Sequence, residues 1–500
     1  MCEVKLKMSG KYKDEESYRW YIPKRYIVAA LGFLGMFNVY AMRVNLSVAM
    51  VAMVNHTKAP NETLAFAECA NLIREEKGTE GYKGEQYNWD MKTQGYILGS
   101  FFYGYIATQL PGGTISEKFG AKWLFACGIL VTAVFSLLTP LAASLGTAVF
   151  ITVRVLEGLG EGVTFPAINV VISRWAPSVE RSRLSTVIFT GAQIGNVIAL
   201  PVSGWLSSSD ILGGWPSVFY VFGTIGCVWF VFWSVFVYEQ PADNPAISKE
   251  ELLYIQLNKE DKQNKSPSSI PWKCIFTSLP MWAVIVAHFG HNFGFLILLT
   301  EMPTYLSTIL HFNLKENGAL SAVPYIVQAM TAWAASFVAD WLRKTNKFTN
   351  TTIRKVCNSV GLFGPAVCLL GITFSGCQPK VIVALLSLAM ALNGFIYSGF
   401  NITHVDMSPD LAGTLFGITN AISNFCGIIG PAVVGALTAS GATIANWSDV
   451  FYITSAVYVV SAVFYAIFAS AELQPWGIVT DVETASVKVD NKLQMEKIRS

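Results

Sequence analysis

Charged residues are scarce in this chain. Of its 500 residues, 14% are Asp, Glu, Lys or Arg and 53% are hydrophobic, whereas about 25% of the residues in soluble domains are charged. The net charge is only +2, and the basic residues are scattered over polar stretches. The net charge by itself says nothing about nucleic-acid binding, whereas the composition indicates a membrane protein.

Signals of enzymes and of metal proteins are also missing. The nine cysteines include no Cys-x-x-Cys pair and no metal-ligand spacing, and the polar parts contain no nucleophile-and-base pair or phosphate-binding glycine loop. We therefore predict no enzymatic activity, no catalytic residue, no metal site and no cofactor. Cys69 and Cys377 both fall in loops expected on the oxidising side of a membrane, and the sequence leaves open whether they are bonded.

Long apolar segments dominate the chain instead. About 20 apolar residues span a bilayer as a helix, and twelve segments approach or exceed that length. They cover 26–54, 95–116, 122–145, 147–172, 183–207, 215–238, 279–309, 318–341, 354–375, 380–402, 411–438 and 449–471. We predict an all-α membrane protein with twelve transmembrane helices in two six-helix bundles.

Polar stretches divide the chain into its expected parts. These are a tail at 1–25, a six-helix bundle at 26–238 with an outer loop at 55–94, a linker at 239–278, a second bundle at 279–471 and a tail at 472–500. Asn55 and Asn61 match the N-glycosylation sequon, and Asn61 is the better candidate because Asn55 lies close to a helix end. Ser248 and Glu251 predict a capped helix within the linker.

The short loops predict the orientation. Lys and Arg gather in the loops that follow the second, fourth and eighth segments. Loops rich in these residues stay in the cytosol, so both tails are expected to be cytosolic.

Two of these loops resemble each other and are expected to act as a gate. In each, a small residue precedes an acid by four positions and a base follows; the residues are Gly113, Glu117 and Lys118, and then Ser336, Asp340 and Arg343. The small residue would let two helices approach closely, and the acid would cap a neighbouring helix. Internal repetition is typical of secondary transporters, although two ordinary positively charged loops would also explain the pattern.

Three charges lie inside the fourth apolar segment. Arg154, Glu157 and Glu161 are spaced i, i+3 and i+7, so they share one face of a helix. A charge at the bilayer centre costs about 2.5–3.5 kcal/mol, so this face must contact a cavity or partner charges. Such charges usually mark a transport path, and a static ion-pair lattice is the alternative.

Four stretches carry a family resemblance. They are Tyr40–Ser47, Gln94–Tyr105, Arg154–Pro166 and Gly417–Asn420. In these stretches the chain resembles the major facilitator superfamily. Within it, the chain resembles the anion and phosphate transporter family of sialin, the vesicular glutamate transporters and the type I sodium–phosphate cotransporters, above all the sialin-like branch. The resemblance implies alternating access, with Arg43 contacting an anionic substrate and with Glu157 and Glu161 carrying the coupling proton.

Other polar residues complete the predicted substrate path. The family often has a histidine where this chain has Asn169, and His288 matches a sialin-like histidine. The vesicular glutamate transporters resemble each other in having an arginine at the position of His291. We add Tyr103 and Asn420 as substrate-binding candidates, although each could instead form a helix–helix hydrogen bond.

The charge balance suggests how an anion and a proton could be coupled. Arg43, Arg154, Glu157 and Glu161 sum to zero when all are ionised, and protonation of one glutamate leaves a charge of +1 that complements an anion. We hypothesise that Glu161 carries the proton, that Glu157 pairs with an arginine such as Arg154, and that Arg43 anchors the anion. Glu301, late in the seventh segment, is expected to be hydrated near the outer edge of the membrane.

These observations predict a secondary active transporter for organic anions, such as acidic sugars or acidic amino acids, coupled to protons. The alternatives are a sodium-dependent phosphate cotransporter and, from another class, a non-transporting receptor or scaffold. The expected partners are a small-molecule anion and the lipid bilayer, without nucleic acid, and the protein is expected to act as a monomer. The resemblance favours a lysosomal or vesicular membrane, and the plasma membrane stays open.

Overall fold

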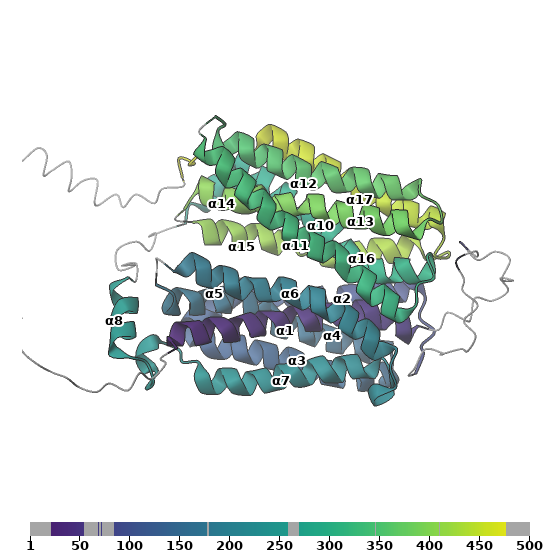
Figure 1. Cartoon of the computed structure of the whole chain (residues 1–500), viewed down its shortest axis with the longest axis horizontal. Helices are drawn as coiled ribbons and strands as arrows, with labels where there is room; N and C mark the ends of the chain where they lie inside the picture. Colours follow the sequence, from purple (N-terminus) through teal and green to yellow (C-terminus); the bar gives the residue numbers. More distant parts are fainter. Residues whose placement is uncertain are drawn as a thin grey trace, which may run out of the picture.

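The computed structural model describes residues 22–54, 69, 72, 85–177, 180–258, 270–345, 347–409 and 411–476. The first helical group contains α1 (Lys24–Met53), α2 (Met91–Phe119), α3 (Ala121–Leu145), α4 (Thr147–Gly162), α5 (Thr164–Trp175), α6 (Arg181–Ser207), η3 (Ile211–Gly213) and α7 (Pro216–Phe236). The linker contains η4 (Pro241–Asp243), α8 (Lys249–Leu257) and α9 (Trp272–Thr277). The second group contains α10 (Leu279–Thr308), α11 (Leu314–Lys344), α12 (Asn350–Thr373), α13 (Pro379–Asn393), η6 (Gly394–Ser398), α14 (Phe400–Met407), α15 (Ala412–Ser423), α16 (Cys426–Leu437) and α17 (Ile444–Phe468). Figure 1 shows the two groups as two bundles lying side by side.

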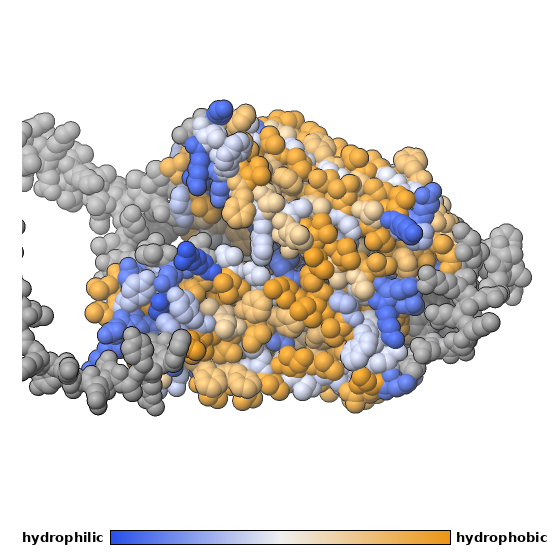
Figure 2. Space-filling view, viewed as in Figure 1, coloured by the Kyte–Doolittle hydropathy of each residue, from blue (hydrophilic) through white to orange (hydrophobic). Residues whose placement is uncertain are grey.

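The described helices account for twelve membrane spans. Eleven stretches are long and apolar enough to cross a membrane, and three of them are interrupted, at α4–α5, α13–η6–α14 and α15–α16. The twelfth is α2, a continuous helix of 29 residues that contains two buried polar side chains, Gln94 and Gln109. Figure 2 shows hydrophobic residues over the middle of the molecule and hydrophilic residues toward its two ends. This is the twelve-helix fold expected from the sequence.

The two ends of the molecule can be told apart. We call the end where α1 begins and α17 ends the tail face, and the opposite end the disulfide face, because Cys69 and Cys377 are bonded there. Near the disulfide face the bundles touch through glycines: Gly95 of α2 lies against Pro431 of α16, and Gly204 of α6 lies against Gly318 of α11. Toward the tail face, Figure 2 shows a hollow between the bundles. The protein is therefore closed at the disulfide face.

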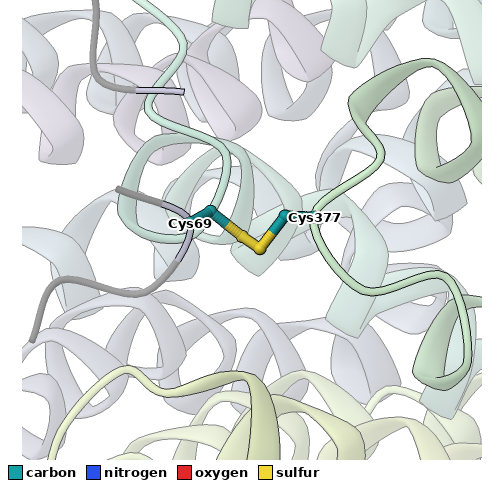
Figure 3. The surroundings of a disulfide bond; sticks show 2 residues. All are labelled: Cys69 and Cys377. Atoms are coloured by element: carbon teal, nitrogen blue, oxygen red, sulfur yellow. A yellow bond between two sulfur atoms is a disulfide. The ribbon is translucent and has the colours of Figure 1, made fainter. Parts of the chain in front are cut away.

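The disulfide joins the two halves of the chain. Cys69 lies between α1 and α2, and Cys377 lies between α12 and α13, 308 residues later (Figure 3). The bond that the sequence left open is thus formed. Asn55 and Asn61, in the same loop as Cys69, lie outside the described residues.

Peptide mapping should find this bond in the purified protein. Digestion without reductant is expected to give one linked pair of peptides containing Cys69 and Cys377, and reductant should separate them. Cys274 is free and exposed, so it serves as the control and should be alkylated with or without reductant. Alkylation of both Cys69 and Cys377 in unreduced protein would contradict the structure.

The linker helix predicted from Ser248 is present as α8. The Ser248 hydroxyl accepts a hydrogen bond from the backbone N–H of Glu251 at 3.1 Å. The Glu251 carboxylate in turn accepts hydrogen bonds from the backbone N–H groups of Lys24 and Arg25 at 2.9 and 3.1 Å, and so caps the start of α1. Arg25 also pairs with Glu180. The linker is therefore attached to the first bundle at the tail face.

The expected gate loops differ from prediction in two respects. Gly113 has no neighbouring atom where a Cβ would be, so no helix packs closely against it. Asp340 is exposed and does not cap α12, because Thr349 accepts the hydrogen bond from the backbone N–H of Thr352. Lys118 and Arg343 are exposed. The side chain of Glu117 lies outside the described residues.

Glu239, which follows α7, caps the start of α3. Its carboxylate accepts hydrogen bonds from the backbone N–H groups of Ala121 and Lys122 at 2.8 and 3.1 Å. It also pairs with Arg174. The capping acid thus comes from a segment distant in sequence, which loop spacing cannot reveal.

Candidate functional site

The glycines of α4 position the charges of the fourth span. Gly158 packs against the backbone of α2 at Phe101, and Gly160 packs against α3 at Gly128. Gly162 packs against Thr108 and Tyr105 of α2. Without side chains at these positions, three helices approach closely. The close approach buries Glu157 and Glu161 completely, with exposed fractions of 1% and 0%.

Adding one methyl group at Gly158 should therefore destabilise the protein. A Cβ there would collide with the carbonyl oxygen of Phe101, and overpacking of this kind costs about 1–3 kcal/mol. Gly158→Ala is expected to lower the thermal unfolding temperature and the yield of folded protein. Gly113→Ala is the matched control, because a Cβ at Gly113 meets nothing within 4 Å. Equal melting temperatures for the two variants would refute this packing.

Two ion pairs form the centre of the site. Arg43 of α1 donates from Nε to Glu161 Oε1 of α4 at 2.6 Å, and a second guanidinium nitrogen pairs with the same oxygen. Arg154 of α4 pairs with Glu157 one turn later on the same helix. All four side chains are buried, so the structure brings together the four charges that the sequence singled out.

The two glutamates have different hydrogen-bond surroundings. Both oxygens of Glu157 have a partner, because Oε2 pairs with Arg154 and Oε1 accepts from the Thr139 hydroxyl at 3.0 Å. Glu161 Oε2 is buried and has no hydrogen-bond donor among the described residues. Glu157 is thus held in a complete pair, whereas Glu161 keeps one oxygen available for a proton or a water molecule.

Aromatic rings surround the arginines. The Arg43 guanidinium lies 4.7, 5.3 and 4.6 Å from the ring centres of Tyr40, Phe101 and Tyr105, and that of Arg154 lies 5.4 Å from Phe101. These distances are typical of cation–π contacts. Sequence reasoning missed these rings, although Phe101 and Tyr105 are four residues apart and so share one helix face.

Tyr103, predicted as a substrate-binding residue, lies on a different face of α2 from Phe101 and Tyr105. Its side chain is 55% exposed, on the same face of α2 as the exposed Tyr96. A shift of two positions turns a helical side chain to a different face, because a turn takes 3.6 residues. Tyr103 therefore points away from the charged cluster.

The arginines line a small cavity between the bundles. Its other lining residues include Ser47 of α1, Phe101 and Phe102 of α2, and Leu299 and Thr300 of α10. The cavity volume is about 20 Å³, which is room for about one water molecule. Neither Glu157 nor Glu161 lines it, and Arg154 Nε has no acceptor among the described residues. The two arginines thus give the lining of the cavity a positive charge.

The histidines of α10 lie apart from this cluster. His288 Nδ1 is 3.0 Å from the Thr419 hydroxyl of α15, and His404 Nε2 of α14 is 2.9 Å from the same oxygen. One hydroxyl therefore connects three helices of the second bundle. His291 lies against the rings of Phe295 and Phe400, and its Nδ1 has no partner in the described part of the chain. Neither His288 nor His291 lines the arginine cavity.

The remaining candidates are also separate from the cluster. Asn169 of α5 is exposed and donates a hydrogen bond to the backbone oxygen of Phe165. Asn420 of α15 is partly buried. Within the described residues, no group of three His, Cys, Asp or Glu side chains could hold a metal ion.

Glu301 differs most from expectation. It was expected to be hydrated, yet only 3% of it is exposed and its Oε1 has no partner among the described residues. Other helices of the protein cover Glu301, because α10 packs between other helices of the second bundle and against α1.

Comparisons with known proteins agree with this architecture. The chain is 44% identical to sialin of Homo sapiens over 454 residues, 91% of each protein. It is 41% identical to vesicular glutamate transporter 3 of Danio rerio over 459 residues, 91% of this chain and 74% of that protein.

A solved structure shows the same fold. It is that of a bacterial homologue of the human lysosomal transporter Spinster, with a TM-score of 0.69 at 14% identity, covering 91% of this chain and 99% of that one. The family model of the Major Facilitator Superfamily matches residues 31–431. The chain is a multi-pass membrane protein and belongs to the Major Facilitator Superfamily.

Proposed function

We propose that the protein is a secondary active transporter that carries organic anions together with protons. One observation supports this most directly: the cavity between the bundles is lined by Arg43 and Arg154, while the paired glutamates lie behind them. A cavity that presents two guanidinium groups is complementary to a carboxylate or phosphate. A scaffold without transport would have no need to bury four charges at this depth.

The geometry supports a simple coupling between proton and anion. With Glu161 ionised, its carboxylate occupies Arg43. When Glu161 takes a proton, its attraction for Arg43 falls, and the guanidinium becomes available to an anion in the adjoining cavity. Arg154 Nε adds a second donor. The anion and the proton therefore enter the same state of the transporter, which is the requirement for symport.

The present cavity is too small for an organic anion. At about 20 Å³ it holds about one water molecule, so substrate binding requires the bundles to separate around it. Closure at the disulfide face and a hollow toward the tail face correspond to one of the two end states of alternating access.

An acidic amino acid or an acidic sugar is the proposed substrate class. The relative from Danio rerio is named a glutamate transporter, and the aromatic rings around Arg43 would pack against an organic anion better than against a small inorganic one. We assign the tail face to the cytosol and the disulfide face to a lysosomal or vesicular lumen, because disulfides persist in oxidising compartments.

Uptake into proteoliposomes tests the proposal. Purified protein should accumulate an acidic sugar or amino acid inside the liposomes when the outside is more acidic than the inside and no sodium is present. A sodium gradient at equal pH should give no accumulation. Sodium-driven uptake of phosphate would instead support the sodium–phosphate alternative. No uptake of any anion under either gradient would overturn the transport proposal.

A further inference from the structure

The second bundle contains a buried acid that the coupling scheme above does not use. Glu301 of α10 is 3% exposed, and Trp447 of α17 is 2% exposed. Glu301 Oε1 is a hydrogen-bond acceptor without a partner among the described residues, and Trp447 Nε1 is a donor without one. A matched pair of unsatisfied polar atoms requires an explanation.

Both side chains line the same small cavity. Its volume is about 10 Å³, and its other lining residues come from α10, α13 and α17; they are Ile297, Leu298, Met302, Tyr305, Leu386 and Phe451. This volume is close to the lower limit for one water molecule. A water here would accept from Trp447 and donate to Glu301, which satisfies both atoms.

No cation faces Glu301 in this cavity. Tyr305 is the only other titratable residue that lines it, and the α13 and α17 residues that line it carry no charge. An ion pair among the described residues of this bundle, Arg354 with the partly buried Asp406, lies at the tail-face end of α12 and α14. A buried carboxylate without a cation is costly, so the charged form must be compensated or avoided.

This cavity lies between the disulfide face and the central arginine cavity. Trp447 is the fourth residue of α17, so it lies about 4.5 Å along the helix from its start at that face. On the other side, Leu299 and Thr300, which precede Glu301, line the arginine cavity. Pro303 follows within the same helix and has no N–H to donate to the Leu299 carbonyl, so α10 can bend here.

We propose that Glu301 is a second proton-binding site, which holds one water molecule with Trp447 and takes its proton from the disulfide face. This inference rests on the proposed proton-coupled transport. Binding of a proton neutralises the Glu301 carboxylate close to Pro303 of α10. Release of the proton restores a negative charge in a cavity that no cation lines within the described part of the chain. The second bundle thereby contributes one proton to each transport cycle, in addition to the proton of Glu161.

The ratio of proton flux to anion flux tests this proposal. In proteoliposomes, the wild type should move one more proton per anion than Glu301→Gln, which keeps the shape of the side chain but cannot take a proton. Asp449→Asn is a control, because it neutralises an exposed acid of α17 that does not line the cavity and should keep the wild-type ratio. An unchanged ratio in Glu301→Gln with uptake intact would overturn the proposal. Wild-type anion uptake without any proton flux would instead overturn proton coupling itself.

An infrared titration tests Glu301 without transport. In a Glu161→Gln background, a buried carboxyl band should still change with pH. It should shift when Trp447 is replaced by Phe, which removes the indole N–H but keeps an aromatic ring. If that band does not titrate, or does not respond to Trp447→Phe, Glu301 is not a proton site. The infrared test does not use Glu301→Gln, so it can still be done if that variant fails to fold.

Discussion

Arg43→Ala is expected to abolish proton-driven anion uptake. Arg43 makes its ion pair with Glu161 through two nitrogens and lines the central cavity. Hydrogen bonds to charged groups contribute about 1.5–3 kcal/mol each. The loss of two such bonds to a substrate carboxylate should lower uptake roughly 100-fold or more, since every 1.4 kcal/mol is about tenfold in affinity.

Arg43→Lys should not restore this activity fully. Lysine keeps the charge but lacks the planar pair of donors that matches a carboxylate. Uptake is therefore expected to lie between those of the wild type and Arg43→Ala, mainly through a higher KM. Radiolabelled uptake at several substrate concentrations separates KM from the maximal rate.

Arg25→Ala is the matched control for the loss of an ion-paired, partly buried arginine. Arg25 also pairs with two glutamates, Glu180 and Glu251, but at the tail face and away from the cavity. It should keep most of the uptake. Wild-type uptake in Arg43→Ala, with equal amounts of folded protein, would show that Arg43 does not bind the anion.

Glu161→Gln should separate anion movement from the proton gradient. Glutamine resembles the protonated acid, so Arg43 stays available to an anion whatever the pH. Uptake driven by a pH gradient should fall at least about tenfold, as expected when a proton-transfer group is lost. Exchange of labelled for unlabelled anion at equal pH, which needs no net proton movement, should continue.

Glu157→Gln should give a different result. Glu157 has partners at both oxygens, Arg154 and Thr139, so its replacement leaves Arg154 buried beside a neutral amide. Removing one member of a buried ion pair costs about 3–5 kcal/mol of stability. The variant should therefore show a lower unfolding temperature and reduced exchange as well as reduced driven uptake.

If Glu161→Gln retains pH-driven uptake at the wild-type rate, Glu161 is not the proton carrier.

The sequence predicted the charged residues of the site more accurately than the residues that surround them. Arg154, Glu157 and Glu161 could be placed on one helix face because helical spacing is local, and the cost of charge in a membrane demands partners for them. The position of Tyr103, away from the arginines, could not be predicted because local spacing does not say which face of α2 meets α1 and α4. Phe101 and Tyr105 face the arginines because Gly104 and Gly158 set the packing of α2 on α4.

The gate loops show the same limit. The acids were expected to cap helices close to them in sequence, but Glu239 caps α3 from beyond α7 and Thr349 caps α12. Which group reaches a helix start depends on how the chain ends converge at the tail face. Spacing within one loop carries no such information.

By itself the sequence determined that this is a twelve-helix membrane protein with paired charges in its fourth span, since apolar length and the cost of buried charge can be read locally. Only the tertiary structure decided that Arg43 meets Glu161, that both arginines line one cavity, and that Glu301 is buried with Trp447 rather than hydrated. Those outcomes depend on which helices pack together, and contacts between residues more than a hundred positions apart leave no periodicity in the chain.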